Sequence, residues 1–259
     1  MMFDKAQVRH AFAAASHSYD SVAHLQREVG MALLQAADLA TLHGTVLDIG
    51  CGTGFLTGHL AQTGCGPLIA LDIALAMLQT TRAKLAAHPQ VHYLCADAEA
   101  LPLAAASIDQ VFSNLALQWC GDLNAVFGDL RRVLKPDGQL RFSTFGPQTL
   151  QELKRAWAAV DSYPHVNDFY TQDQLIASLQ QAGFRHITCR THIYQPHYAS
   201  VLALMRELKD IGAHNVLPGR NKRLTSKTAL HRMMAAYPPN PEPSGITATF
   251  EVFIVSATR

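Results

Sequence analysis

Short apolar runs alternate with segments of helical periodicity through residues 45–145. The apolar runs predict strands, and apolar side chains three or four positions apart predict helices between them. Strands that alternate with helices favour strand–helix–strand units, a mostly parallel sheet and right-handed crossovers. The expected strands are 45–49, 68–72, 92–96, 108–114 and 139–145, and the expected helices are 55–62, 74–87 and 122–134.

The regions on either side of this core have a different pattern. Residues 4–15 and 21–40 are predicted helices, joined by the polar loop 16–20. Later in the chain we expect a helix near 171–182, a strand near 186–194, a helical stretch at 197–236 and a final strand at 246–257. The two late strands predict an antiparallel hairpin at the sheet edge. We therefore expect a helical arm at 1–42 and one α/β domain at 43–259, with 195–245 inserted as a lid over the ligand cleft.

Composition and cysteine spacing limit the class of protein. The 259 residues carry a formal net charge of +1, which leaves no whole-chain signal for nucleic-acid or membrane binding. The five cysteines form no Cys-x-x-Cys pair, so we expect reduced thiols and neither a disulfide framework nor a metal site. No apolar run approaches the roughly 20 residues that span a bilayer. The N-terminal MMFDKAQVRH lacks the apolar core of a signal peptide, and these features together predict a cytoplasmic location.

A glycine-rich turn follows the first predicted strand and opens a helix. It reads Asp48-Ile49-Gly50-Cys51-Gly52-Thr53-Gly54. Glycine permits tight turns and close approach of the backbone to a ligand. The spacing Gly-x-Gly-x-Gly departs from the Gly-x-Gly-x-x-Gly of dinucleotide-binding proteins. A turn with this spacing need not bind a phosphate. Because an acid lies two residues before the first glycine, the turn suits a cationic ligand.

Two further acidic residues end predicted strands. Asp72 ends the second strand, and Asp97, followed by Ala98, ends the third. Ligands of open α/β sheets bind outside the carboxyl ends of the strands, so these acids are expected to converge. Asp72 is placed to accept both hydroxyls of a ribose, or alternatively to cap a helix. Asp97 is placed to accept a hydrogen bond from an adenine amino group.

Five motifs in order resemble those of the class I S-adenosylmethionine-dependent methyltransferases. They are VLDIGCGTG, the Leu-Asp pair at 71–72, CADAEALP, DQVFSNLALQW and RVLKPDGQLRFSTF. The resemblance implies a Rossmann-like α/β fold with a seven-stranded, mostly parallel sheet, and S-adenosylmethionine as cofactor. It assigns Gly50 and Gly52 to the methionine part, Asp72 to the ribose, and Asp97 and Ala98 to the adenine, with Asn114 and Leu115 closing the methionine side. Asp48, Gly54 and Ile73 complete the expected cofactor site.

The flanking segments resemble a narrower family, the malonyl-acyl-carrier-protein O-methyltransferases of biotin synthesis. The matching segments are FAAASHSYDSVAHLQREVGMALL, SNLALQWCGDLNAV, FSTFGPQTLQELKRAWAAVD with HVNDF after it, and LMRELKDIGAHNV with its later Gly-Arg. The chain departs from that family at NKRLTSKTAL, where the family usually has a glycine-richer turn. The resemblance implies methylation of the free malonyl carboxylate on an acyl carrier protein or coenzyme A. The product would be the malonyl methyl ester that primes pimeloyl and biotin synthesis.

The acceptor in such a reaction is an anion at neutral pH, so we expect no general base. A carboxylate needs a cationic or hydrogen-bonding seat, and a guanidinium can grip it in bidentate fashion. Arg206, with Lys209 one turn on, and Arg220 are the leading candidates, against the alternative of a solvated helix face paired with Glu207 and Asp210. Tyr19 and Trp119 are expected to wall the cleft, although Trp119 is equally suited to core packing. The single histidines His17, His24 and His165 are interpreted as structural or surface residues.

The predicted lid carries a local basic patch. Between Ile211 and Pro241 there is no aspartate or glutamate, while Arg220, Lys222, Arg223, Lys227 and Arg232 fall in the same stretch. Acyl carrier proteins are strongly acidic, so the patch suits their docking by electrostatic steering. A solvated surface is the alternative, and no nucleic-acid-binding module is recognisable. The runner-up functions are methylation of a quinone or sterol-like acceptor and a non-catalytic S-adenosylmethionine-binding module.

Overall fold

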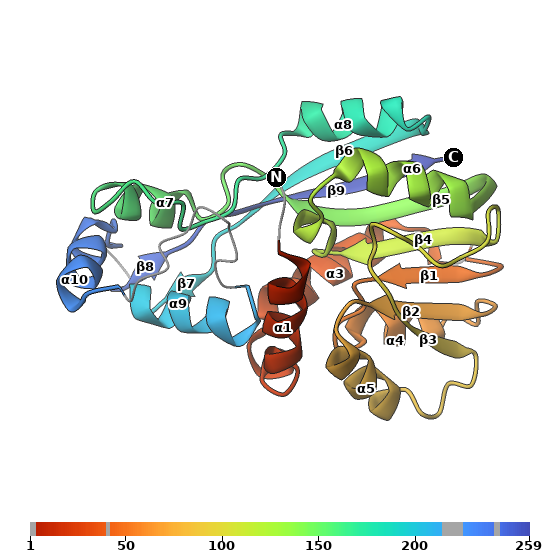
Figure 1. Cartoon of the computed structure of the whole chain (residues 1–259), viewed down its shortest axis with the longest axis horizontal. Coiled ribbons are helices and arrows are strands. Elements are labelled where there is room, and N and C mark those ends of the chain that lie inside the picture. Colours follow the sequence, from red (N-terminus) through yellow and green to blue (C-terminus); the bar gives the residue numbers. More distant parts are fainter. Residues whose placement is uncertain (1–3, 40–41, 214–224, 241–243) are drawn as a thin grey trace.

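A central sheet organises the computed structural model of the chain (Figure 1). The structure describes residues 4–39, 42–213, 225–240 and 244–259. Within these ranges seven strands form the main sheet in the order β3-β2-β1-β4-β5-β9-β6. Their bounds are Val46–Ile49 (β1), Leu68–Asp72 (β2), Val91–Cys95 (β3), Ile108–Asn114 (β4), Leu134–Phe145 (β5), Arg185–Tyr194 (β6) and Phe250–Thr258 (β9).

The strand directions confirm the predicted sheet. Strands β1 to β5 pair in parallel, and β9 runs antiparallel to both β5 and β6. The two late strands therefore form the expected antiparallel pair at the sheet edge. All four residues of β1 are buried, as expected for a central strand covered on both faces. Strand β5 begins five residues earlier than predicted, because Leu134 already pairs with Ile108 of β4.

Helices cover both faces of the sheet. Neighbouring residues of a strand point to opposite faces, so Phe112 of β4 joins the core beneath α3 while Val111 joins the core beneath α6. Helix α6 begins where the Asp122 carboxylate accepts hydrogen bonds from two backbone amides of its first turn, and its apolar side then packs inward. The helices that follow β1, β2 and β4 are α4 (Phe55–Ala61), α5 (Leu75–Lys84) and α6 (Leu123–Val133), and α8 (Gln172–Gln181) precedes the edge strand β6.

The N-terminal arm consists of three helices, α1 (Lys5–Ala15), α2 (Tyr19–Val22) and α3 (His24–Ala36). The predicted loop at 16–20 is thus partly helical, because α2 begins at Tyr19. Helix α3 packs against β4, β5 and β9, whereas α1 contacts α5. In Figure 1 the helix α1 lies between α9 and α5. The arm therefore lies alongside the main domain and contributes to its core.

The later part of the chain differs most from the prediction. Helix α7 (Gln151–Ala158) was not expected, and a short 3-10 helix, η2 (Leu117–Trp119), follows β4. The helical stretch predicted at 197–236 is wrong at its start, where β7 (His197–Tyr198) pairs with β8 (Ile246–Thr247). Helix α9 (Val201–Asp210) begins only after Ser200, whose hydroxyl caps it, and α10 (Lys227–Ala236) is a separate helix. The predicted final strand is likewise divided into β8 and β9.

All five cysteines lie in the described ranges and none is in a disulfide. No cluster of three or more histidine, cysteine, aspartate and glutamate side chains suited to a metal ion occurs among the described residues. Within the same ranges, no helix has both the length and the apolar character needed to cross a membrane.

Candidate functional site

The glycine turn after β1 combines close packing with an open space. Gly50, Gly52 and Gly54 all have positive φ angles, +68°, +54° and +86°. A Cβ on Gly50 would lie 2.2 Å from the Cβ of Ala116, and a Cβ on Gly54 would lie 2.6 Å from Thr81 Cγ2. A Cβ on Gly52 would meet nothing within 4 Å. The first and third glycines therefore permit packing, and the space over Gly52 is left for a ligand.

Asp72, at the end of β2, braces this turn. Its Oδ2 accepts a hydrogen bond from the Gly52 amide at 2.9 Å, and its Oδ1 accepts one from the Ala74 amide at 2.8 Å. The side chain is buried, and burial raises the pKa of Asp72 to about 6. Asp72 holds the backbone before α5, whose N-cap is Ala74, and it also lines a cavity. A carboxylate has about four acceptor sites, so capacity remains for ligand hydroxyls.

Asp48 carries the one buried side-chain oxygen or nitrogen without a hydrogen-bond partner among the described residues. The Thr57 hydroxyl donates to Oδ2 at 2.6 Å, while Oδ1 has no partner. Burial, reinforced by nearby Asp72, raises the pKa of Asp48 to about 7. An unpartnered buried carboxylate oxygen is costly unless a ligand satisfies it. Asp48 lines a small cavity of about 420 Å³ beside the glycine turn, together with Tyr19, Gly52 and Arg27.

A larger space, the first cavity, lies at the carboxyl ends of β1, β2 and β4. Its empty volume is about 690 Å³. The structure brings together in its wall most of the predicted cofactor residues, namely Gly50, Gly52, Asp72, Ile73, Asp97, Ala98, Asn114 and Leu115. Asp48 lines the small cavity instead, and Gly54 precedes α4 without lining the first cavity. The convergence expected from the strand ends is therefore present for these eight residues.

The arm forms one wall of the first cavity; Tyr19 was expected there, but the contribution of α1 was not. Lys5, Val8 and Phe12 of α1 line it together with Tyr19 of α2. The Lys5 Nζ lies 3.2 Å from Asp97 Oδ1 and 2.7 Å from Glu99 Oε1, which joins α1 to the loop after β3. Lysine at position 5 gave no signal in the sequence, because its partners lie more than ninety residues away in the chain.

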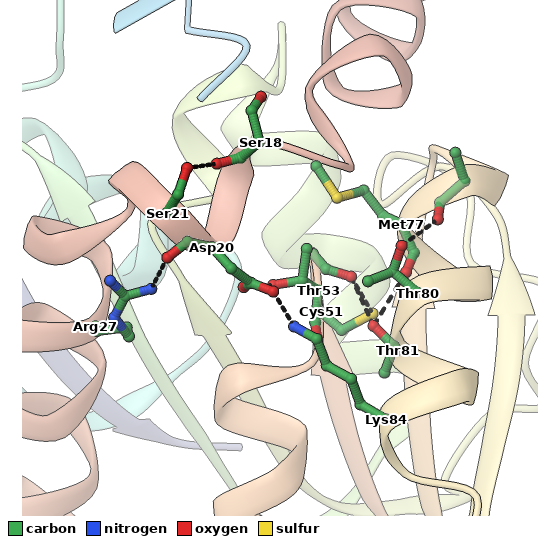
Figure 2. Close-up of polar contacts among 12 residues, drawn as sticks. Ser18, Asp20, Ser21, Arg27, Cys51, Thr53, Met77, Thr80, Thr81 and Lys84 are labelled. Atoms are coloured by element: carbon green, nitrogen blue, oxygen red, sulfur yellow. Dashed lines mark hydrogen bonds and ion pairs between the residues drawn. The ribbon is translucent and has the colours of Figure 1, made fainter. Parts of the chain in front are cut away.

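A second set of contacts ties α2 to the glycine turn (Figure 2). The Asp20 carboxylate accepts a hydrogen bond from Thr53 Oγ1 at 2.6 Å and pairs with Lys84 Nζ of α5. Lys84 Nζ also donates to the Thr53 carbonyl at 3.1 Å, and Arg27 Nη1 donates to the Asp20 carbonyl at 2.7 Å. Partial burial acts to raise the pKa of Asp20, but the hydrogen bonds from Lys84 and Thr53 outweigh it and lower that pKa. These contacts join the arm to the glycine turn and to α5.

A second cavity adjoins the first. Its empty volume is about 850 Å³, and its walls come from the arm, the end of β5, the segment 165–169 and α9. Phe12, Tyr19, Leu115 and Trp119 line both cavities, so these side chains lie at the boundary. The Phe12 and Trp119 rings meet edge to face with centroids 5.4 Å apart. Tyr19 and Trp119 thus occupy the wall of the cleft, as expected, and burial raises the pKa of the Tyr19 hydroxyl.

Of the two arginines expected to seat the carboxylate, only Arg206 lies among the described residues. Arg206 is exposed and lines neither cavity, because α9 turns Glu207, Leu208 and Ile211 toward the second cavity. Glu207 is paired with Tyr198, whose hydroxyl donates to Oε1 at 2.7 Å. Arg220, Lys222 and Arg223 lie outside the described residues.

His165, interpreted as a structural or surface residue, stacks on Trp157 and also lines the second cavity. A sequence signal was available, since His165 lies within the flanking segment HVNDF.

Comparisons with known proteins agree with this geometry. A family model described as a methyltransferase domain matches residues 47–142. The structure of the YcgJ protein of Bacillus subtilis superposes with a TM-score of 0.66 at 14% identity, covering 89% of this chain and 97% of that one, which supports the fold. The biotin biosynthesis bifunctional protein BioHC of Cellvibrio japonicus is 43% identical over 251 residues, which are 96% of this chain and 49% of that protein, so the chain spans about half of its length.

A shorter relative matches along most of both chains. The malonyl-[acyl-carrier protein] O-methyltransferase of Methylococcus capsulatus is 44% identical over 252 residues, covering 96% of this chain and 92% of the relative. An identity of this size over both lengths includes the arm and the insertion as well as the glycine turn. The chain belongs to the malonyl-[acyl-carrier protein] O-methyltransferase family.

Proposed function

We propose that this chain transfers a methyl group from S-adenosylmethionine to the free carboxylate of a malonyl thioester. The thioester is carried on an acyl carrier protein or coenzyme A, and the product is the malonyl methyl ester that primes pimeloyl and biotin synthesis. The observation that carries the proposal is the 44% identity to a malonyl-[acyl-carrier protein] O-methyltransferase over 92% of that relative. The two adjoining cavities support it, because one suits a cofactor and the other an acceptor.

The residues of the first cavity fit S-adenosylmethionine. The open space over Gly52 and the acceptor capacity of Asp72 suit the ribose, and Asp97 with Ala98 suits the adenine. The unpartnered Asp48 oxygen, in the adjoining small cavity, suits a positively charged amino group. When bound, this cofactor supplies an electrophilic methyl group on a sulfonium. Asn114 is already fixed, since it donates to the Gln26 carbonyl at 2.8 Å, and it is suited to closing the methionine side.

The protein's task in the reaction is alignment and exclusion of water. A malonyl carboxylate is ionised at neutral pH, so an attacking oxygen is available without a base. The new C–O bond forms as the C–S bond breaks, and the positive sulfonium and negative carboxylate charges disappear together without proton release. Phe12, Tyr19 and Trp119, at the boundary of the two cavities, are positioned to keep the reacting atoms aligned and dry. The raised pKa of Tyr19 keeps its hydroxyl a hydrogen-bond donor.

The carrier protein would dock on the basic part of the insertion. Lys227 and Arg232 are exposed on α10, which lies beside α7 at one end of the molecule (Figure 1). Arg232 Nη2 donates to the Ala159 carbonyl at 3.3 Å, so α10 is joined to the loop that follows α7. The other residues of the predicted basic patch, Arg220, Lys222 and Arg223, lie outside the described residues. Positive charges at a rim accelerate association with an acidic partner.

The domain division and location are part of the same proposal. Residues 1–42 act as an arm, and 195–245 act as a lid on the domain at 43–259. Support for the lid comes from α9, which supplies Glu207 and Ile211 to the wall of the second cavity. A cytoplasmic location follows from the proposed substrate and agrees with five cysteines that form no disulfide.

A panel of acceptors tests the function. The protein is incubated with S-adenosylmethionine and malonyl-acyl-carrier protein, malonyl-coenzyme A, succinyl-coenzyme A or a demethylated quinone, and products are identified by mass spectrometry. We expect rapid methylation of a malonyl thioester, slower methylation of the succinyl thioester and none of the quinone. The Asp72→Ala protein serves as the control for cofactor dependence. Methylation of the quinone alone would replace the proposal with the runner-up function.

A further inference from the structure

Asn167 is a largely buried residue whose side-chain amide has no hydrogen-bond partner among the described residues. It lies in the segment between α7 and α8, its residue is 8% exposed, and it lines the second cavity. No described residue forms a hydrogen bond with its side chain. Its amide is not among the buried side-chain atoms that lack a partner, so it stays accessible to the cavity, where a ligand that displaces water must offer it equivalent hydrogen bonds. Because the amide borders the cavity, a bound ligand is positioned to satisfy it.

The segment that carries Asn167 is held on both sides. Before it, the His165 ring stacks on Trp157 with centroids 3.8 Å apart and planes at 6°, and its Nε2 donates to Asp161 Oδ1 at 2.8 Å. After it, the Phe169 ring packs edge to face on Phe145 at 5.6 Å. Anchoring on both sides presents the amide from a fixed position, which reduces the entropy lost when a ligand binds.

The charges around the second cavity favour a neutral donor for the acceptor. Among the described residues that line this cavity there is no lysine or arginine. Its wall at α9 carries the Glu207 carboxylate, which accepts a hydrogen bond from Tyr198. Glu207 repels a second carboxylate, so an anionic acceptor is directed away from α9 and needs a hydrogen-bond donor elsewhere in the wall. Asn167 offers two N–H donors.

We propose that the Asn167 amide binds one oxygen of the malonyl carboxylate and leaves the other free to attack. This inference rests on the proposed function and assigns its substrate-binding residue. Methylation removes the negative charge of the carboxylate, so a full ion pair would stabilise the substrate more than the transition state. A neutral amide orients the carboxylate with a smaller penalty of this kind. His165 acts as a positioning residue, because it fixes the segment through Trp157 and Asp161.

The first test replaces the amide by a carboxylate of the same shape. Asn167→Asp is expected to raise the KM for the malonyl thioester that the wild-type protein methylates by at least about thirtyfold, because two carboxylates then face each other. Its affinity for S-adenosylmethionine, measured by calorimetry, and its melting temperature should stay near the wild-type values. Asn167→Ala, which removes the donor without adding charge, should raise KM by about tenfold. Asn124→Asp, on the exposed first turn of α6, is the matched control and should change neither value.

The second measurement separates a carboxylate seat from a general effect on the cavity. The methyl ester of the same malonyl thioester is used as a competitive inhibitor, since it carries the same acyl chain without the charge. The Asn167→Asp protein should bind this neutral ester within about threefold of wild type while losing affinity for the acid. Equal loss on acid and ester would overturn the assignment, as would an unchanged KM in both Asn167 variants. If the wild-type protein neither binds nor methylates any malonyl thioester, the proposed function fails and this inference fails with it.

Discussion

Asp48 offers a prediction that depends on its burial and on little else. Asp48→Asn keeps the shape of the side chain and the contact with Thr57, but it removes the ionisable group. Burial raises the pKa of Asp48 from 3.8 to about 7 in the folded chain. Between these two pKa values the folded protein retains a proton that the unfolded chain has released. The free energy of unfolding therefore falls as pH rises through this window, and the contribution is lost above the folded pKa.

The size of the effect follows from the same pKa. Each pH unit below the folded pKa is worth about 1.4 kcal/mol. Two units separate pH 5 from a pKa of about 7, so ionisation of Asp48 lowers the free energy of unfolding by about 3 kcal/mol between pH 5 and pH 8. Asn cannot ionise, so the Asp48→Asn protein should lack this part of the decline. Asp72, whose pKa is about 6, contributes in both proteins, and because its charge also raises the pKa of Asp48, part of the measured difference is the interaction between these two carboxylates.

Urea unfolding at pH 5 and pH 8 measures the difference directly. The matched control is Asp137→Asn, because Asp137 is an aspartate whose side chain is 87% exposed. The control should decline with pH as the wild type does, and Asp48→Asn should decline by about 3 kcal/mol less. Wild-type affinity for S-adenosylmethionine should also rise from pH 5 to pH 8, since a positively charged group favours the ionised carboxylate. Equal declines of the free energy of unfolding in wild type and Asp48→Asn would refute the assigned burial of Asp48. A wild-type affinity for S-adenosylmethionine that does not rise with pH would refute the ligand role of Oδ1.

Three further changes test the rest of the site. Asp72→Ala should weaken S-adenosylmethionine binding by roughly 2–3 kcal/mol, about two orders of magnitude in Kd by calorimetry, and an unchanged Kd would remove Asp72 from the cofactor site. The double variant Lys227→Glu, Arg232→Glu should raise the KM for malonyl-acyl-carrier protein several-fold at low salt and leave the KM for malonyl-coenzyme A near the wild-type value. An equal rise of KM for both substrates would indicate damage to the lid instead of lost docking. Asp20→Ala should raise the Kd for S-adenosylmethionine only a few-fold, as expected for a partly exposed pair worth about 1 kcal/mol or less, and should speed proteolysis within the arm; identical proteolysis would show that this contact does not hold the arm closed.

The sheet and the cofactor residues were predictable because their signals are local. Buried parallel strands appear as continuous apolar runs, and the strand ends that carry Asp72 and Asp97 meet at one edge of the sheet by topology alone. Helix α7 was missed because it has only eight residues and begins after Leu150, a residue with a φ of 55° that no pattern of apolar positions indicates.

The substrate side was less predictable because its geometry is set by tertiary packing. The spacing of Arg206 and Lys209 placed them on one helix face, but only the packing of α9 shows that Glu207 is turned inward. Lys5 meets Asp97 through the docking of the arm, a contact between residues 92 apart in the chain. Asn167 lies within the flanking segment HVNDF, but only the fold shows that it lines the second cavity without a hydrogen-bond partner among the described residues.

One measurement tests the central claim most directly. The purified protein is incubated with malonyl-acyl-carrier protein and S-adenosylmethionine carrying a ¹³C-labelled methyl group, and the product is examined by NMR. We predict a labelled O-methyl resonance of a malonyl ester, formed by the wild-type protein and strongly reduced with Asp72→Ala when the S-adenosylmethionine concentration is near the wild-type Kd. A label on carbon or nitrogen, or no transfer to malonyl-acyl-carrier protein or malonyl-coenzyme A while another acceptor is methylated, would contradict the account.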